Sequence, residues 1–319
     1  MPKKNKIIWA KLIANPGAGN VLEAASKIEQ AMRYLIDAGL KVDVALAKPK
    51  KEAIPIARKA IKDGYDLVIA MGGDGTLGAV IRGIAGSKVR LGIIAAGTEN
   101  DIARSLGIPE DLKEACALIA SGHTRKLDLG QVSTRKKKKF YFFMLTAIGL
   151  TATIFPIIKE VPEGKLSGIR KAVATLFKFE SKPIVNLTLD DESKIEVETM
   201  LVTIANTPLI GAKNLVAPDA SMEDGLLDIA VYPDFSKADL LAYFAKSAHE
   251  RSTPDGTIQR YRARKIKVKT SPKLDVAAEG IILGKGTARI KILPGALRVL
   301  APSRAPARKK RRKRRLPGN

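Results

Sequence analysis

The first 130 residues of the chain alternate between short apolar segments and segments with helical periodicity. Apolar runs that predict strands lie at residues 6–14, 42–47, 66–71, 90–95 and 126–129. Helical patterns lie between them at 21–37, 52–63 and 110–120, with two more after Gly75 and Thr98. Because each connection between parallel strands needs a crossover, usually a helix, this alternation predicts an α/β domain with a doubly wound parallel sheet.

Beyond residue 130 the pattern changes, and strands dominate. A hairpin is predicted at 131–149 around a basic run, and helices at 164–178 and 237–246. The other apolar segments predict strands at 184–189, 195–205, 227–232, 265–269, 274–278 and 288–293. Since few helices separate these strands, we predict a second domain that is mainly antiparallel β.

The composition sets outer limits on the fold. With 319 residues, of which 45% are hydrophobic, the chain can bury a sizeable core and divide into two domains. The single cysteine, Cys116, excludes a disulfide framework and a cysteine-based zinc site, and its helical surroundings predict a small core residue. The two histidines, His123 and His249, stand among polar residues and are predicted to lie at the surface.

The chain carries a net charge of +24, and the cations are unevenly spread. Residues 308–315 are eight consecutive lysines and arginines, and residues 135–139 are five more. Such a surface favours anionic partners, which could be nucleotides, nucleic acid or an acidic membrane. Residues 303–319 are rich in proline and cations, and we predict that they form a disordered basic tail.

Two segments resemble membrane-directed sequences but are predicted not to act as such. The apolar run near the N-terminus is broken at Lys11, which argues against a signal peptide. Residues 140–158 form a stretch of 19 without a charge, long enough to span a bilayer. Gly149 and Pro156 interrupt this stretch, and its first residues have a strand pattern. We therefore predict no transmembrane span.

The loop Gly72-Gly73-Asp74-Gly75-Thr76 follows a buried strand and opens a helix. Glycines allow close approach of the backbone to a ligand, and a helix N-terminus offers free N–H groups to phosphate. A carboxylate at Asp74 would repel phosphates unless it addresses a metal ion, a hydroxyl or a proton. The alternative is a tight turn with Thr76 as the helix cap. We favour a site for a nucleoside triphosphate.

Two further glycine-bearing loops stand at strand ends, at residues 15–19 and 95–101. In an open parallel sheet, ligands bind at the carboxyl ends of the strands. The second loop has another explanation, because Thr98 and Asp101 have the spacing of a capping box. Together the three loops would outline a nucleotide cleft.

Carboxylates gather in two places in the second half of the chain. Residues 217–228 place four of them in a turn before a strand, which suits Mg²⁺ or Ca²⁺ as well as it suits a solvated acidic loop. Asp275 and Glu279 are four residues apart, a spacing that puts both on one face of a strand. Either could serve as a general base, and two exposed strand carboxylates are the alternative.

These motifs together resemble the diacylglycerol kinase catalytic family, in its bacterial soluble lipid-kinase branch, which is related to sphingosine and ceramide kinases. The resemblance covers about residues 6–302. The matching motifs, in chain order, are Asn15-Pro16-x-x-Gly19, Gly72-Gly73-Asp74-Gly75-Thr76, Gly97-Thr98-x-Asn100-Asp101-x-Ala103-Arg104, Leu127-Asp128-Leu129-Gly130, Ala217-Pro218-Asp219-Ala220-x-x-x-Asp224-Gly225-Leu226-Leu227-Asp228 and Leu293-Pro294-Gly295-Ala296-Leu297.

The resemblance implies an α/β nucleotide-binding domain at 1–130 and 294–302, followed by a β-sandwich lipid-substrate domain at 131–293. It implies ATP and Mg²⁺ as cofactors. The residues it assigns to the nucleotide are Asn15, Pro16, Gly17, Ala18, Gly19, Gly72, Gly73, Asp74, Gly75, Thr76, Leu77, Gly78, Gly97, Thr98, Asn100 and Asp101. Those assigned to a structural Mg²⁺ are Ser221, Asp224, Leu226 and Asp228.

This chain departs from the family pattern at several positions. The catalytic Asp-Gly-Glu of the family reads Glu279-Gly280-Ile281, so the first carboxylate is one methylene longer and the second is absent. An Asn-Glu pair after the Gly72 loop is replaced by Gly78-Ala79. Three further replacements are alanine for threonine, alanine for proline and methionine for asparagine, at Ala47, Ala95 and Met144.

The leading hypothesis is an ATP- and Mg²⁺-dependent kinase that phosphorylates a lipid hydroxyl. Glu279, helped by Asp275, would accept the hydroxyl proton, and Asp74 would organise metal and water near the γ-phosphate. The basic tail would hold a cytoplasmic enzyme on the inner face of the membrane. The alternatives are a non-catalytic nucleotide- or lipid-binding regulator, an NAD kinase and a nucleic-acid binder. A homodimer remains open.

Overall fold

The structure is a computed structural model that describes residues 8–17, 21–47, 52–150, 152, 183–210, 214–215, 217–233, 235–236, 239 and 258–303. Several predictions lie outside these residues. They are the helices at 164–178 and 237–246, the basic tail, the surface position of His249, and nucleotide contacts at Ala18 and Gly19. Within the described part of the chain, no helix combines the length and the apolar character that crossing a bilayer requires.

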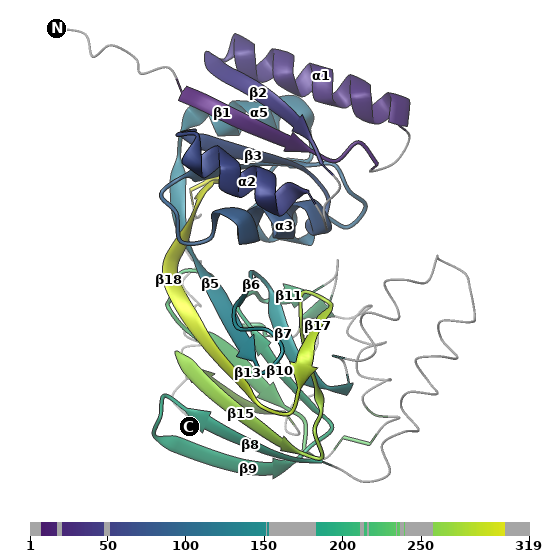
Figure 1. Ribbon diagram of the computed structural model, residues 1–319, viewed down its shortest axis with the longest axis vertical. Helices are drawn as coiled ribbons and strands as arrows, with labels where there is room; N and C mark the ends of the chain where they lie inside the picture. Colours follow the sequence, from purple (N-terminus) through teal and green to yellow (C-terminus); the bar gives the residue numbers. More distant parts are fainter. Residues whose placement is uncertain are drawn as a thin grey trace, which may run out of the picture.

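The N-terminal domain is a parallel sheet with helices on both faces, as predicted (Figure 1). Its strands lie in the order β2, β1, β3, β4, and all are parallel. These strands are β1 (Ile8–Ala14), β2 (Leu40–Leu46), β3 (Leu67–Gly72) and β4 (Arg90–Ala95). The helices are α1 (Val21–Asp37), α2 (Ala53–Lys62), α3 (Asp74–Ile84), α4 (Asp101–Leu106) and α5 (Leu112–Ser121).

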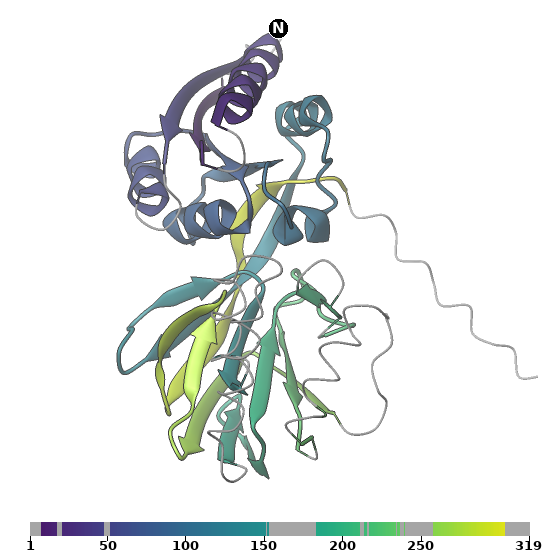
Figure 2. The ribbon, with the colours of Figure 1, turned by 90° about the vertical axis from the view of Figure 1, so that its right-hand side faces the viewer.

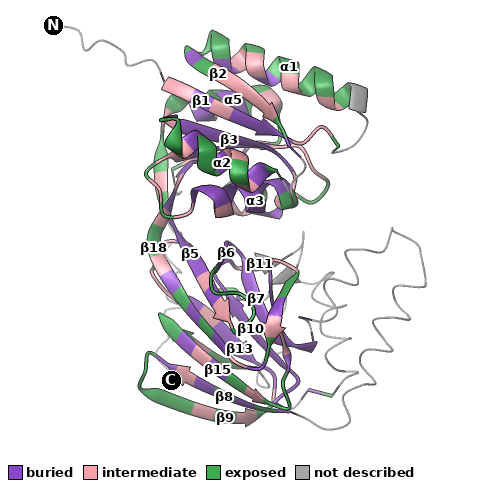
Figure 3. Ribbon diagram, in the orientation of Figure 1, coloured by how far each residue is buried: buried purple, intermediate pink, exposed green. Residues whose placement is uncertain are grey.

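Alternate residues of the central strand β3 pack into two different hydrophobic cores. Leu67 and Ile69 pack with residues of α1 and α5, whereas Val68 and Ala70 pack with residues of α2 and α3. Figure 3 shows β3 buried throughout its length. A strand that is buried on both faces has no polar alternation, which explains the continuous apolar run in the sequence. Cys116 lies in the α1–α5 core, and burial raises the pKa of its thiol to about 11.

The second domain is a sandwich of two sheets. One sheet is antiparallel, in the order β14, β13, β10, β7, β16, β17. It faces the strands β15, β8 and β9, which belong to the same sheet as the strands of the first domain. A single core joins them, with Val132 and Leu187 from one sheet and Ile204 and Ile229 from the other. The strands are β6 (Phe140–Phe142), β7 (Leu145–Gly149), β8 (Ile184–Leu189), β9 (Ser193–Glu198), β10 (Leu201–Ala205), β13 (Leu227–Val231), β14 (Gln259–Ala263), β15 (Lys265–Ser271), β16 (Asp275–Ala278) and β17 (Ile281–Lys285), with the short pair β11 (Leu209–Ile210) and β12 (Asn214–Leu215).

Two long strands run through both domains, as Figure 2 shows for β5 (Thr124–Thr134) and β18 (Ala288–Leu300). They pair antiparallel along most of their length, and the upper end of β18 also pairs with β4 in parallel. The register shifts between Leu293 and Leu297, where the ladder bulges. The boundaries predicted at 130 and 294 therefore fall inside these strands, and one sheet of ten strands continues from the first domain into the second.

The strand predicted at 195–205 is two strands in different sheets. β9 belongs to the ten-stranded sheet and β10 to the antiparallel one, and the chain crosses between them at Thr199 and Met200. The Thr199 hydroxyl contacts the carbonyls of Leu201 and Tyr232 at 3.0 and 2.9 Å, which holds this crossing. The pattern changes at this crossing, because charged and apolar residues alternate in β9, whereas every residue of β10 is buried.

Candidate nucleotide site and domain junction

The Gly72 and Gly97 loops touch each other through their backbones. A Cβ atom on Gly97 would lie 2.4 Å from the Cα of Gly73, so only glycine permits this approach. The contact lies at the carboxyl ends of β3 and β4, as expected for two loops on one edge of a parallel sheet. The glycines thus bring two chain segments, some 20 residues apart, into one backbone surface.

The Asp74 carboxylate holds the two loops together in a way that the sequence did not predict. Its oxygens accept hydrogen bonds from the backbone N–H groups of Asp101 and Ile102, at 3.1 and 2.9 Å. These groups are the first turn of α4, so Asp74 caps a helix other than its own. Helix α4 begins at Asp101 and has no side-chain cap from its own N-cap residue, which is Asn100 and not the Thr98 of the capping-box alternative.

The N-terminus of α3 is formed without a side-chain cap. Gly73 is the N-cap residue, and Thr76 is buried in the first turn instead of capping the helix. The first N–H groups of any helix lack an acceptor within the helix. Because Gly75 is exposed and carries no side chain, these donors are accessible to an anion.

Asn100 fixes the shape of the Gly97 loop. Its backbone is left-handed, with φ of 53°, a conformation that asparagine tolerates better than most residues. Its side-chain amide accepts from Gly97 N–H at 2.9 Å and donates to Gly97 C=O at 2.8 Å. These two bonds hold the loop in one conformation.

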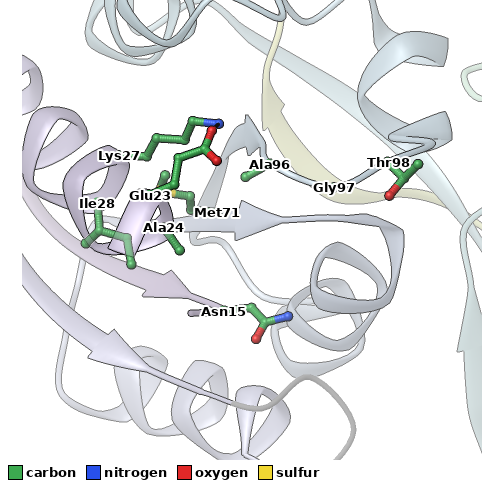
Figure 4. Close-up of a pocket in the computed structure, with 9 residues that line it drawn as sticks. All are labelled: Asn15, Glu23, Ala24, Lys27, Ile28, Met71, Ala96, Gly97 and Thr98. Atoms are coloured by element: carbon green, nitrogen blue, oxygen red, sulfur yellow. Dashed lines mark ion pairs between the residues drawn. The ribbon is translucent and has the colours of Figure 1, made fainter. Parts of the chain in front are cut away.

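A pocket with a volume of about 260 Å³ opens beside these loops (Figure 4). Asn15 stands at one side of it, and its Oδ1 accepts from Gly17 N–H at 3.1 Å. Helix α1 adds Glu23 and Lys27, which form an ion pair at 2.8 Å and which the loop motifs did not identify. The lining residues are Asn15, Glu23, Ala24, Lys27, Ile28, Met71, Ala96, Gly97 and Thr98.

Glu279 lies in the second domain, directly after β16. Its backbone is left-handed, with φ of 52°, and its Oε1 accepts from the N–H groups of Met144 and Leu145, at 2.8 and 3.2 Å. The carboxylate is therefore turned back onto the segment before β7. A strained backbone held by such bonds is frequent at functional sites.

Asp275 and Glu279 stand at opposite ends of β16. Asp275 begins β16 and pairs with Lys285 of β17, with Oδ1 and Nζ 3.5 Å apart. The expected sharing of one strand face does not occur, because Glu279 leaves the strand in a left-handed turn.

The fold and the loops match one family of known proteins. Residues 10–132 match the model of the diacylglycerol kinase catalytic domain. Residues 150–301 match that of the YegS C-terminal NAD kinase beta sandwich-like domain. The chain belongs to the diacylglycerol kinase catalytic family.

Individual members of the diacylglycerol kinase family match over nearly the whole chain. A diacylglycerol kinase of Mycobacterium tuberculosis is 29% identical over 308 residues, which are 94% of this chain and 97% of that protein. One of Bacillus subtilis is 28% identical over 280 residues, covering 85% and 89%. The crystal structure of a diacylglycerol kinase from Bacillus anthracis has a TM-score of 0.70 at 24% identity, covering 94% and 98%, and so shares the fold.

The diacylglycerol kinase resemblance assigns a structural Mg²⁺ to residues 217–228. In the structure, two carboxylates of this segment are paired with an arginine from another strand. Arg262 of β14 forms ion pairs with both Asp224 and Asp228; its Nε is 3.3 Å from Asp228 Oδ1. Asp224 also accepts from Leu226 N–H at 3.1 Å, and the Ser221 hydroxyl accepts from Glu223 N–H at 3.3 Å.

Asp228 Oδ2 is buried and has no hydrogen-bond donor among the described residues. One remaining carboxylate oxygen does not make a magnesium site, so an ion would have to displace Arg262. Within the described part of the chain, no cluster of three acidic, histidine or cysteine residues is arranged to hold a metal. As arranged here, these residues do not fit Mg²⁺, and the predicted metal site stays a prediction.

Asp128 joins this segment to the bulge in β18, a role that its place in the Leu-Asp-Leu-Gly motif did not reveal. Its two oxygens accept from Gly225 N–H and Gly295 N–H, each at 2.7 Å. Asn206 donates to the Asp128 carbonyl at 3.0 Å from a fully buried position. Three distant segments therefore meet at one buried carboxylate.

Proposed function

We propose that this protein is an ATP- and Mg²⁺-dependent kinase that phosphorylates the hydroxyl of a diacylglycerol-like lipid. The observation that carries the proposal is the clamp of Asp74 on α4, which fixes two glycine loops against each other beside the exposed N-terminus of α3. Such a surface presents backbone N–H groups in a fixed array, and phosphoryl transfer depends mainly on positioning and on neutralising charge.

The two domains would divide the work. The loops at Gly73 and Gly97 would bind the phosphates, and the pocket between α1 and the Gly97 loop would take the adjoining part of the nucleotide. Asp74 would hold Mg²⁺ together with phosphate oxygens of the nucleotide, through the lone pairs that its two N–H bonds leave. When bound, Mg²⁺ would neutralise charge on the phosphate oxygens.

Glu279 would accept the proton of the lipid hydroxyl. The hydroxyl oxygen then forms its bond to the γ-phosphorus as the bond to the β-phosphate oxygen breaks, and ADP leaves. The two backbone N–H bonds to Oε1 support this role because they fix the direction of the carboxylate. The replacement of the second family carboxylate by Ile281 leaves Glu279 as the base in this proposal.

The second candidate is a regulator that binds nucleotide or lipid without turnover. Its support is Ile281, which stands 38% exposed in β17 at the place of the absent carboxylate. Peripheral binding to anionic membranes is part of both candidates, since it rests on the basic composition of the chain.

One assay separates these functions. The protein is incubated with labelled ATP, Mg²⁺ and a mixed lipid extract, and labelled phospholipid is measured. We expect transfer by the wild type and at least a hundredfold loss in Glu279→Gln, in line with the usual contribution of a general base. Asp191→Asn is the matched control, because that exposed carboxylate lies in the β8–β9 turn. Absence of transfer with retained thermal stabilisation by ATP would reject the kinase and favour the regulator.

A further inference from the structure

Helix α3 carries an arginine on the same face as the glycines of its first turns. Gly75, Gly78 and Arg82 follow the spacing of i, i+3 and i+7 that aligns residues along one side of a helix. The Arg82 side chain lies back over Gly78, since a Cβ on Gly78 would be 3.2 Å from one of its guanidinium nitrogens. The cation thus points toward the N-terminus of α3, as long helical side chains do.

The surroundings of Arg82 place it between the two domains. Its guanidinium stands over the ring of Phe140 in β6, with 5.1 Å to the ring centre. Burial lowers the pKa of the guanidinium, and the charge of Glu279 acts in the opposite direction. Arg82 is therefore close enough to feel the carboxylate that would act as base, while it belongs to the helix that would bind phosphate.

Arg82 has no ion pair and no hydrogen bond within the described residues, where it interacts with the Phe140 ring and, through space, with the charge of Glu279. A half-buried guanidinium without a directly bound anion costs free energy, because it has lost water and gained only the Phe140 ring and the through-space attraction of Glu279. Gly78 leaves the space that the guanidinium occupies, at a position where the family resemblance has a larger residue. Both features indicate that this space receives an anion.

We propose that Arg82 binds the terminal phosphate of the nucleotide and neutralises its charge as the phosphoryl group passes toward Glu279. This inference rests on the proposed function and extends it to a specific ligand atom group. A planar guanidinium offers several donors to phosphate oxygens, and its fork geometry permits a bidentate contact. Arg82 would thus be a catalytic residue that the loop motifs do not contain.

The test measures dissociation constants for ATP, ADP and AMP with Mg²⁺ by calorimetry, in the full chain. We expect Arg82→Gln to weaken ATP about 10- to 100-fold, ADP less and AMP hardly at all, because a charge-assisted contact to the last phosphate is lost. Arg82→Lys should restore part of the affinity for ATP. Arg58→Gln is the matched control, since Arg58 is exposed on α2.

A second variant tests the geometry with the charge retained. Gly78→Ala places a methyl group against the guanidinium and should also weaken ATP selectively. If Arg82→Gln lowers the melting temperature but leaves the ratio of ATP to AMP affinity unchanged, Arg82 only joins α3 to β6 and the inference is wrong.

A measurement of kinase turnover separates a failure of this inference from a failure of the proposed function. A wild type that binds ATP through Arg82 but transfers no phosphate to lipid would overturn the kinase and leave the Arg82 site in place. An active kinase whose Arg82→Gln variant keeps its kcat and its ATP affinity would overturn the Arg82 site alone. A wild type that binds no nucleotide would overturn both.

Discussion

Asp74 and Asp224 are both followed by a glycine, yet their carboxylates are satisfied in different ways. Asp74 accepts two backbone N–H groups of a neighbouring helix, whereas Asp224 pairs with the side chain of Arg262. Backbone donors keep their positions whatever the side chains are, so the Asp74 clamp sets geometry. A side-chain cation can be exchanged for another cation, so the Asp224 pair sets charge balance. The first arrangement suits a binding surface, and the second suits a structural joint.

Removing the Asp74 clamp should have the largest effect. Asp74→Ala leaves the first turn of α4 without its acceptors, and the loss of two charge-assisted hydrogen bonds predicts a destabilisation of about 2–4 kcal/mol. Nucleotide binding should be lost as well, because the two loops are no longer held together. Chemical denaturation and calorimetry measure the two effects. Unchanged ATP affinity in this variant would show that the clamp does not organise the site.

The contact between the glycine loops should be nearly as sensitive. Gly97→Ala forces a methyl group into the backbone of Gly73, and overpacking of this kind costs about 1–3 kcal/mol. Gly75→Ala is the control, since a Cβ at that position meets no atom within 4 Å. We expect the first variant alone to melt at a lower temperature. Equal melting temperatures for the two variants would contradict the close approach.

The stability of the protein should depend on added metal cations once Arg262, which forms ion pairs with the carboxylates of Asp224 and Asp228, is removed. Arg262→Ala leaves Asp224 and Asp228 facing each other without a cation, which predicts a loss of about 1–2 kcal/mol. Millimolar Mg²⁺ or Ca²⁺ should then raise the melting temperature of this variant more than that of the wild type. Arg289→Ala, an exposed change in β18, serves as the control. A variant that ignores both ions would show that this segment cannot hold a metal.

The smallest effect is expected from the charge of Asp228. Burial raises its pKa above the ordinary value, so the ionised form is disfavoured in the folded state. The resulting penalty is present above the folded pKa and disappears as the pH falls below the unfolded value of about 4. Asp228→Asn should therefore stabilise the protein by up to about 1 kcal/mol at pH 7 and hardly at all near about pH 3. Urea denaturation at both values of pH measures this, and a gain that persists at the lower value would point to another cause.

Prediction from sequence succeeded where contacts are local and periodic. The bounds of α1 and β4 match the predicted segments, because a helical or a buried strand pattern is legible within a short window. The loop at Gly72 could be placed at a strand end for the same reason. Four strands of the second domain were missed: β14, β17 and the short pair β11 and β12. Of these, β14 carries more polar than apolar residues.

Other features depend on partners that are far away in the chain. Asp74 accepts a hydrogen bond from a backbone N–H group 27 residues later in the chain. Glu279 accepts one from a backbone N–H group more than 130 residues earlier, and Asp128 accepts one from a backbone N–H group 167 residues later. No local pattern encodes these pairs, since each arises only when the sheets assemble. The same holds for Arg82, whose importance depends on the position of Phe140 and Glu279.

The strand β18 has a consequence for how the chain acquires its structure during synthesis. It supplies the neighbour of β4 in the first domain and of β15 in the second, and its upper end pairs at residues 298 and 299. Until the ribosome has released those residues, the edge of β4 lacks its final partner, and an open edge attracts other strands. Pairings over such a long sequence distance also form slowly. During synthesis, the sheet of the N-terminal domain therefore keeps the edge at β4 unpaired until β18 has been made.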